Sequence, residues 1–228
     1  PQIRLADNYK EVFLDHYGEN NPELIFFHQA PDQQEIEQNN GPVGFSGENH
    51  GKGITSPTQN LVDAFPVLDG KPICESSKYP YSYTNMYKDR DPRFEMTILH
   101  NGSKWLNKDL ETYEEGINNP AGSNQKTKTS YYMRKFMGNF ENSNVYDNTL
   151  HLWVMYRYAE ILLNYAESLI EYSGPTDEVY AYIIALRKRA GIEPGDDELH
   201  GLKENRDTNE KRIVIQNERR IEMAYEEQ

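Results

Sequence analysis

The run 155-MYRYAEILLNYAESLIEYSG-174 constrains the fold more than any other stretch of this chain. Its apolar residues recur at helical spacing, while polar residues such as Arg157 and Glu160 interrupt them. The pattern predicts a helix over about 154–172, which the sequence Ser-Gly-Pro from residue 173 ends. Because the apolar residues occupy more than one side, we expect several neighbours around this helix. Its polar groups are then expected to form internal hydrogen bonds and ion pairs that hold a buried helix in place, and not to form a functional site.

The two apolar sides of this helix are expected to meet different neighbours. One side consists of Ile161, Leu162, Tyr165 and Leu169, and the other of Leu163, Ala166 and Ile170.

Two further helices are predicted after it. The first opens on Thr176 and ends at Gly191, and it forms an antiparallel hairpin with the preceding helix. The second starts near Asp207 or Thr208 and continues to the end of the chain. Residues at helical spacing in these two helices are expected to be buried, namely Val179, Tyr182, Ile183, Leu186, Ala190, Val214, Ile221 and Tyr225.

Residues 1–150 have a different pattern, with short apolar runs between long polar loops. We expect a short helix within 8–18, where Val12, Phe13 and Tyr17 share a side and Gly18 gives a stop. The run 24-LIFFHQ-29 predicts a buried strand, and 30–57 predicts a long loop.

Further turns and strands are predicted downstream in this first part. Thr58 caps a short helix that Pro66 ends, and Asp69-Gly70 forms a tight turn. Residues 94–99 alternate as in a strand and lead into a hairpin turn at Asn101-Gly102. The second alternating run, 129–136, is a candidate partner for that strand.

Composition excludes several classes of protein. The chain has 228 residues, a net charge of -13 and a pI of about 4.9, so a nucleic-acid-binding surface is not expected. Cys74 is the only cysteine, which excludes an internal disulfide and a cysteine-based metal site. No stretch has the length and apolar character of a membrane span, and the first residues do not resemble a signal peptide.

Catalytic and cofactor motifs are not recognisable. The six histidines are scattered, without the spacing of a zinc protease, and no nucleophile elbow is present. The glycine-rich run 41-GPVGFSGENHGKG-53 fits neither a dinucleotide nor a P-loop motif. Asp89, Asp91 and Glu95 could hold calcium, but a turn at Asp91-Pro92 before the strand is the favoured interpretation. We therefore predict no catalytic residue, no metal site and no cofactor.

Aromatic side chains in loops give the strongest indication of ligand binding. Their planar faces can stack on a sugar ring or a peptide side chain, although ordinary packing explains many single tyrosines. Asn49 and His50 of the glycine-rich run supply polar groups beside them. The predicted ligand-binding residues are Trp105, Tyr81, Tyr83, Tyr79, Tyr87, Asn49 and His50.

Charged residues near the end of the chain suggest a different role. Glu218 and Glu222 lie one helical turn apart beside Arg219 and Arg220, which predicts a buried ion network between helices. We also expect Glu160 to pair with an arginine such as Arg157 or Arg219.

Several segments in order resemble the C-terminal part of the SusD/RagB family of nutrient-binding lipoproteins. These segments are 21-NPELIFF-27, 57-PTQNLVDAFPVLDGKPI-73, 91-DPRFEMTILHNG-102, 129-TSYYMRKF-136, 157-RYAEILLNYAES-168, 183-IIALRKRAGI-192 and 217-NERRIEMAYE-226. The resemblance implies a mainly α fold with irregular loops and a small β-hairpin. Within one SusD-like C-terminal domain, 1–150 would be the loop-and-strand part that binds ligand, and 151–228 the tetratricopeptide-like helical part.

The same resemblance implies a function. Such proteins are not enzymes; they capture oligosaccharides at the outer membrane's extracellular face and deliver them to a SusC-like TonB-dependent transporter. RagB-like members bind peptides instead, and this is the alternative. The parent protein would be lipid-anchored, and this chain is expected to be a fragment that lacks the anchor. A hydrolase and a helical-repeat adaptor are the hypotheses from other classes. Under the binding hypothesis, Trp105→Ala weakens oligosaccharide binding without unfolding the protein.

Overall fold

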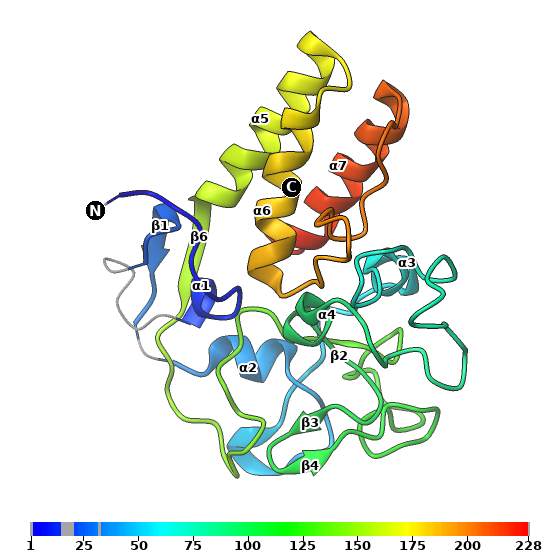
Figure 1. Ribbon diagram of the computed structural model, residues 1–228. Coiled ribbons are helices and arrows are strands. Elements are labelled where there is room, and N and C mark those ends of the chain that lie inside the picture. Colours follow the sequence, from blue (N-terminus) through cyan, green and yellow to red (C-terminus); the bar gives the residue numbers. More distant parts are fainter. Residues whose placement is uncertain (1, 15–20, 32, 228) are drawn as a thin grey trace.

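The computed structural model describes residues 2–14, 21–31 and 33–227. In Figure 1 three long helices form one end of the molecule, and short helices, short strands and loops form the rest. The fold is mostly helical with small two-stranded antiparallel sheets, as the sequence predicts. The division of the chain at residue 150 stays a prediction.

The long helices begin and end at the residues that their caps specify. Helix α5 is Tyr158–Ser173, α6 is Asp177–Ala190 and α7 is Thr208–Glu222. Gly191 ends α6 in the left-handed conformation, at a φ of 90°. The side chain of Asp207 accepts from the Glu210 amide, and the Glu210 side chain accepts in return, which forms a capping box at the start of α7.

These three helices share one core, and α5 and α6 form the predicted hairpin (Figure 1). This core includes side chains that are at most 1% exposed, among them Leu163, Ala166, Ile170, Val179, Ile183, Leu186 and Ile215. Tyr165, expected to face a neighbour, is 48% exposed and meets Tyr182 edge-on at 5.0 Å. The prediction that the last helix continues to the chain end is wrong. It stops at Glu222, and Tyr225 lies in a turn with a φ of 66°.

Strands β1 (Leu24–Gln29) and β6 (Leu152–Arg157) pair antiparallel over their length. The strand β1 forms where predicted, but it is not buried as expected: among its residues Leu24 is buried and Phe26 is 61% exposed. Residues 154–157 are strand rather than the first turn of the helix. In β6, buried Leu152 and Val154 alternate with exposed Trp153 and Met155, which is the period of a strand. The apolar run therefore contains a strand and a helix in direct succession.

Residues 94–99 contradict the strand prediction for the most part. Asp91 caps helix α4 (Pro92–Thr97) by accepting from the Arg93 amide, and Pro92 occupies its first position. A capping residue followed by proline starts a helix, and this local signal outweighs the alternation. Strand β2 (Ile98–Leu99) keeps the end of the predicted strand and pairs with β5 (Tyr132–Met133), as expected.

The β-hairpin turns at a different place from the one predicted. It joins β3 (Lys104–Trp105) to β4 (Lys108–Asp109) through Leu106 and Asn107. Both turn residues have positive φ values, 49° and 57°, as a tight two-residue hairpin requires. Asn101-Gly102 lies just before this hairpin instead of at its tip.

The remaining elements are short. They are α1 (Glu11–Leu14), α2 (Glu35–Asn40), the 3₁₀ turn η2 (Gly47–Asn49) and α3 (Gln59–Ala64). Thr58 caps α3 by accepting from the Leu61 amide, as predicted. Val12 and Phe13 are buried as expected, whereas Tyr17 and Gly18 lie outside the described residues. No helix in the described ranges is both long and apolar enough to cross a membrane.

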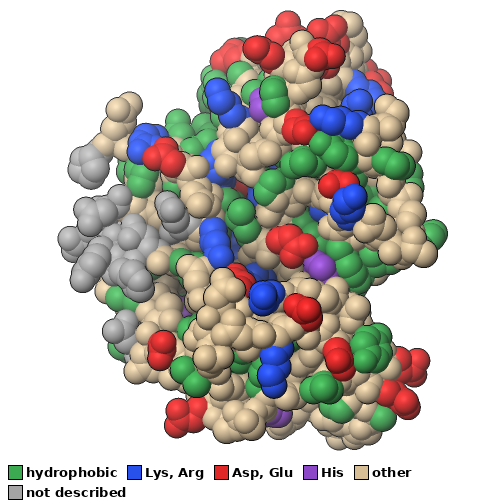
Figure 2. All heavy atoms as spheres, turned by 60° about the horizontal axis from the view of Figure 1, so that its bottom comes forward, with side chains coloured by type: hydrophobic (Ala, Val, Ile, Leu, Met, Phe, Trp, Pro, Cys, Tyr) green, Lys and Arg blue, Asp and Glu red, His purple; other side chains and the backbone are tan. Residues whose placement is uncertain are grey.

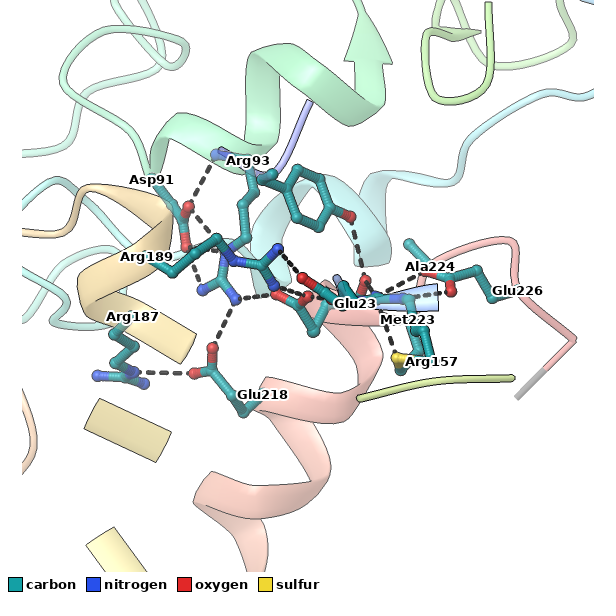
Figure 3. A network of polar contacts seen from close by, with 12 residues as sticks. Glu23, Asp91, Arg93, Arg157, Arg187, Arg189, Glu218, Met223, Ala224 and Glu226 are labelled. Atoms are coloured by element: carbon teal, nitrogen blue, oxygen red, sulfur yellow. Dashed lines mark hydrogen bonds and ion pairs between the residues drawn. The ribbon is translucent and has the colours of Figure 1, made fainter. Parts of the chain in front are cut away.

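A buried ion network joins the long helices to the rest of the fold (Figure 3). It contains five acidic and five basic side chains, so its formal charges balance. The members are Glu23, Asp91, Glu218, Glu222, Glu226, Arg93, Lys135, Arg157, Arg187 and Arg189. Ion pairs of this kind require nearly complete pairing, because an unpaired charge in the core is costly.

Glu222 is the centre of this network. It accepts from Arg93 at 2.9 Å and from Arg157 at 2.8 Å, and Arg189 pairs with it as well. Burial raises the pKa of the Glu222 carboxyl, but the three guanidinium groups outweigh burial and hold it well below its usual range. The Tyr9 hydroxyl donates to the Glu222 carbonyl at 3.0 Å.

The network agrees only partly with the sequence prediction. Glu218 and Glu222 are members, but their arginine partners come from other elements, and Arg219 lies instead beside Asn164, at 2.7 Å. Arg157 binds Glu23, Glu222 and Glu226 in place of Glu160. The buried partners come from the turn before β1 and from α4, β6 and α6, and sequence separations of this size give no local pattern.

Candidate ligand-binding surface

The tyrosine-rich loop 78–89 projects between α3 and α4 and is held at its start. The Tyr79 hydroxyl donates to Glu193 Oε1 at 2.7 Å, and Lys78 pairs with the same carboxylate. The Tyr79 amide also donates to Ser76, whose hydroxyl donates to Asp69 at 2.7 Å. Tyr79 therefore anchors the loop, and its hydroxyl is engaged.

Tyr81 and Tyr83 form an aromatic pair on this loop. Their ring centroids are 5.8 Å apart, with the planes at 73°. Tyr83 is 85% exposed, the second most exposed of the large apolar and aromatic side chains among the described residues. In this arrangement the Tyr81 ring contacts the Tyr83 ring and supports it, while the Tyr83 ring stays exposed. An exposed ring of this kind can stack on a flat apolar surface of a ligand.

Tyr87 packs within the protein. Its ring stacks on His100 with centroids 3.8 Å apart, and its hydroxyl donates to Tyr131 at 3.4 Å. His100 in turn lies parallel to Phe94 at 5.4 Å. These contacts cover a face of Tyr87 and tie the end of the loop to α4.

Trp105 does not have the exposed ring that was expected of it. The side chain is 0% exposed, and its indole N–H donates to the Tyr146 hydroxyl at 2.8 Å. The ring packs edge-on against Phe140 at 5.9 Å, with the Arg134 guanidinium 5.1 Å from its centroid. The prediction that Trp105 stacks on a ligand is wrong for this arrangement, because the hairpin turns the residue inward to form a core.

Asn49 and His50 connect loops to each other. Asn49 accepts from the Tyr146 amide at 2.8 Å and donates to the Asn144 carbonyl at 3.2 Å. The Nδ1 atom of His50 lies 3.3 Å from the Phe45 carbonyl. Both side chains thus hold the glycine-rich run in place through hydrogen bonds. That they also bind a ligand stays a prediction.

Asp91 does not act as an exposed calcium ligand. Its carboxylate is buried, accepts from the Arg93 amide at 2.9 Å and pairs with the Arg93 guanidinium at 2.7 Å. The expected turn at Asp91-Pro92 before a strand is also wrong, because Asp91 is the N-cap of α4 and Pro92 is in its first turn.

A cavity of about 790 Å³ lies beside β6, away from the tyrosine-rich loop. Its walls come from β1, α2, β6, the stretch around β5 and the turn after α7. The lining residues are His28, Ala30, Gln33, Glu35, Ile36, Asn39, Asn40, Thr55, Met133, Phe136, His151, Leu152, Trp153, Val154, Met155, Tyr225, Glu226 and Glu227. Sequence reasoning missed this site because residues 154–157 were assigned to a helix. The alternation of Leu152, Trp153, Val154 and Met155 was the signal.

The molecular surface is chemically mixed on the face shown in Figure 2. Acidic, basic and apolar side chains are interspersed there, and no broad basic patch covers that face. This agrees with the net charge of -13 and gives no support to a polyanion-binding role for this face.

Comparison with known proteins gives one consistent result. A family model described as the SusD family matches residues 22–228. The SusD-like protein P2 of Formosa agariphila is 38% identical over 74 residues, which make up 32% of this chain and 15% of that protein.

Solved structures agree with the family match. A SusD-like carbohydrate binding protein from Bacteroides fragilis has a TM-score of 0.76 and 27% identity, over 97% of this chain and 43% of that chain. A further SusD-like protein from the same species has a TM-score of 0.71 and 26% identity, over 96% of this chain and 44% of that one. Surface glycan-binding protein A from Bacteroides uniformis has a TM-score of 0.56 and 19% identity, over 99% and 40%, which shows a shared fold alone. The chain spans less than half the length of these solved proteins.

Proposed function

The chain belongs to the SusD family, whose glycan-binding members are non-catalytic, and on this premise we propose that it captures oligosaccharides and releases them unchanged. The single observation that carries this proposal is the match to a solved SusD-like carbohydrate binding protein over 97% of this chain. Residues 1–150 would supply the binding loops, and 151–228 their helical support.

The Tyr81–Tyr83 pair supports a binding role for the tyrosine-rich loop. A sugar ring presents an apolar C–H face and a rim of hydroxyls, so it can stack on Tyr83 while its hydroxyls meet polar neighbours. The Tyr81 hydroxyl is protonated at neutral pH and able to donate, and burial raises its pKa further. Tyr79 and Tyr87 hold the two ends of this loop through Glu193 and His100.

Delivery to a SusC-like TonB-dependent transporter at the outer membrane's extracellular face is the second part of the proposal. It rests on the family, in which such binding proteins serve nutrient uptake from the cell surface. Affinity must be moderate for this task, because a ligand that is held too tightly is not passed on. A lipid anchor on the parent protein would keep it next to the transporter.

Calorimetric titration tests the binding role. We would titrate the 228-residue chain with maltohexaose, cellohexaose, xylohexaose and mannohexaose, and with a pool of hexapeptides. The proposal predicts binding of at least one hexasaccharide, and the double variant Tyr81→Ala/Tyr83→Ala should weaken the binding at the tyrosine-rich loop about tenfold or more. Tyr172→Ala is the matched control, because Tyr172 is 92% exposed on α5, remote from the loop. Binding of peptides alone would replace the proposal with the RagB-like alternative.

A further inference from the structure

We propose that the cavity beside β6 is an oligosaccharide subsite in which Trp153 is the stacking platform, and that it selects neutral over anionic glycans. This inference rests on the proposed function and adds a site and a substrate class to it. None of the residues 78–89 lines the cavity, so it is separate from the Tyr81–Tyr83 pair.

Trp153 faces the cavity because of its place in the sheet. It pairs with His28 across β1 and β6, and it points away from the core that its neighbours Leu152 and Val154 fill. Its side chain is 55% exposed, and Met155, two residues on, is 44% exposed. A half-exposed indole on a cavity wall is a large accessible apolar surface, and such surfaces mark binding sites.

Polar groups suited to sugar hydroxyls also line the cavity. Asn39 and Asn40 come from the last turn of α2, and Thr55 follows in the next loop. The Thr55 hydroxyl donates to Asn40 Oδ1 at 2.8 Å, and the Asn40 amide donates to the Ile36 carbonyl at 3.1 Å, so these side chains are fixed in place. Gln33 and Glu35 extend this row at the start of α2. An aromatic ring and several hydrogen-bonding groups in one cavity are the components that binding of a pyranose ring requires.

The cavity walls are held in place by buried ion pairs. His151 lies 3.2 Å from Glu37, whose other oxygen accepts from the Gly138 amide at 2.8 Å. Burial lowers the pKa of His151, but the hydrogen bond to Glu37 outweighs burial and leaves the pKa above its ordinary value. Glu226 on the facing wall is bound by Arg157 at 2.7 Å and by Lys135. A preformed site of this kind loses little entropy when the ligand binds.

The charges around the cavity disfavour anionic ligands. Glu35 and Glu227 line it, as does Glu226, whose charge Arg157 and Lys135 neutralise; no lysine or arginine lines it among the residues that the structure describes. Lys52 approaches from outside and donates to Asn39 at 3.0 Å. Together with the net charge of -13, this arrangement repels uronic acids and sulfated sugars.

Tryptophan fluorescence tests the site directly, because the two tryptophans differ in exposure. Trp105 is 0% exposed and Trp153 is 55% exposed, so neutral acrylamide quenches mainly Trp153 in the free protein. A hexasaccharide that binds in the cavity should reduce quenching at least twofold, and it should do so equally in the Tyr81→Ala/Tyr83→Ala variant. Hexagalacturonate should give no protection. If Trp153 is already shielded in the free protein, another segment covers the cavity and the inference is wrong.

Substitution separates this inference from the proposed function. Trp153→Ala should weaken hexasaccharide binding at the cavity about tenfold or more, Trp153→Phe should retain most of it, and the Tyr172→Ala control should retain all of it. If a hexasaccharide binds the protein but Trp153→Ala changes neither affinity nor stoichiometry, the subsite is refuted and the proposed function stands. If no oligosaccharide binds at all, the proposed function fails and the subsite fails with it. Stronger binding of hexagalacturonate than of neutral sugars would refute the charge argument.

Discussion

Replacing Glu222 with glutamine removes one negative charge from the centre of the buried ion network and keeps the size of the side chain. Arg93, Arg157 and Arg189 all pair with this carboxylate, and Glu222 is 0% exposed. The five basic groups would then face four acidic ones, in a place that water does not reach. Breaking a buried pair while its partner charge remains costs about 3–5 kcal/mol.

Urea unfolding followed by circular dichroism measures this cost. With a slope of about 2 kcal/mol per M, the loss lowers the midpoint by roughly 1.5–2.5 M. The matched control is Glu171→Gln, which removes the ion pair with Arg212 on the surface of α5. That pair is 49% and 34% exposed, so its loss should cost no more than about 1 kcal/mol. If the two variants differ by less than about 1 kcal/mol, the network does not hold the fold together in the way described.

Three further predictions follow from the same contacts. Trp105→Ala should destabilise the protein by about 3–5 kcal/mol in urea unfolding, because the indole is fully buried, and an unchanged midpoint would show that the ring is not part of a core. Acidification should destabilise the folded protein. Burial raises the carboxyl pKa values of Glu218, Glu222 and Glu226, but their basic partners lower these pKa values by more, so the folded-state values lie below the unfolded value of about 4.5. The stability that these carboxylates give the folded state is therefore complete above a pH of about 4.5 and is lost as the pH falls below it. A urea midpoint that stays constant from pH 6 to pH 3 would contradict this. Gly70→Ala should lower the melting temperature markedly, because Gly70 has a φ of 76° and an added Cβ would overlap the His200 carbonyl. A decrease of less than about 2 °C would contradict that close approach.

Local signals in the sequence were sufficient to predict where most of the long helices begin and end. The helix caps act through hydrogen bonds or backbone angles within a few residues, as at Thr58, Asp207, Gly174 and Gly191. The helix ends that they set can therefore be predicted without knowledge of the rest of the fold. The α5–α6 hairpin follows from its periodic apolar residues. Local signals also explain the main error, because Asp91 and the proline after it start a helix where alternation alone suggested a strand.

Contacts between residues far apart in the sequence determine the features that could not be predicted from local patterns. Trp105 is buried by Phe140 and Tyr146, more than 30 residues later, and nothing near Trp105 in the sequence reports this. The partners of Glu222 lie 33, 65 and 129 residues away. Trp153 was detectable from alternation, but its role depends on α2 and the turn after α7, which meet it only in the folded protein.

The most direct test of the central claim is a titration followed by analysis of the recovered ligand. The 228-residue chain is titrated calorimetrically with the four neutral hexasaccharides, and the sugar is then released and examined by anion-exchange chromatography after long incubation. The account predicts saturable binding of at least one hexasaccharide and its recovery at full length. Failure of every oligosaccharide to bind, or the appearance of shorter products, would contradict a non-catalytic glycan-binding role.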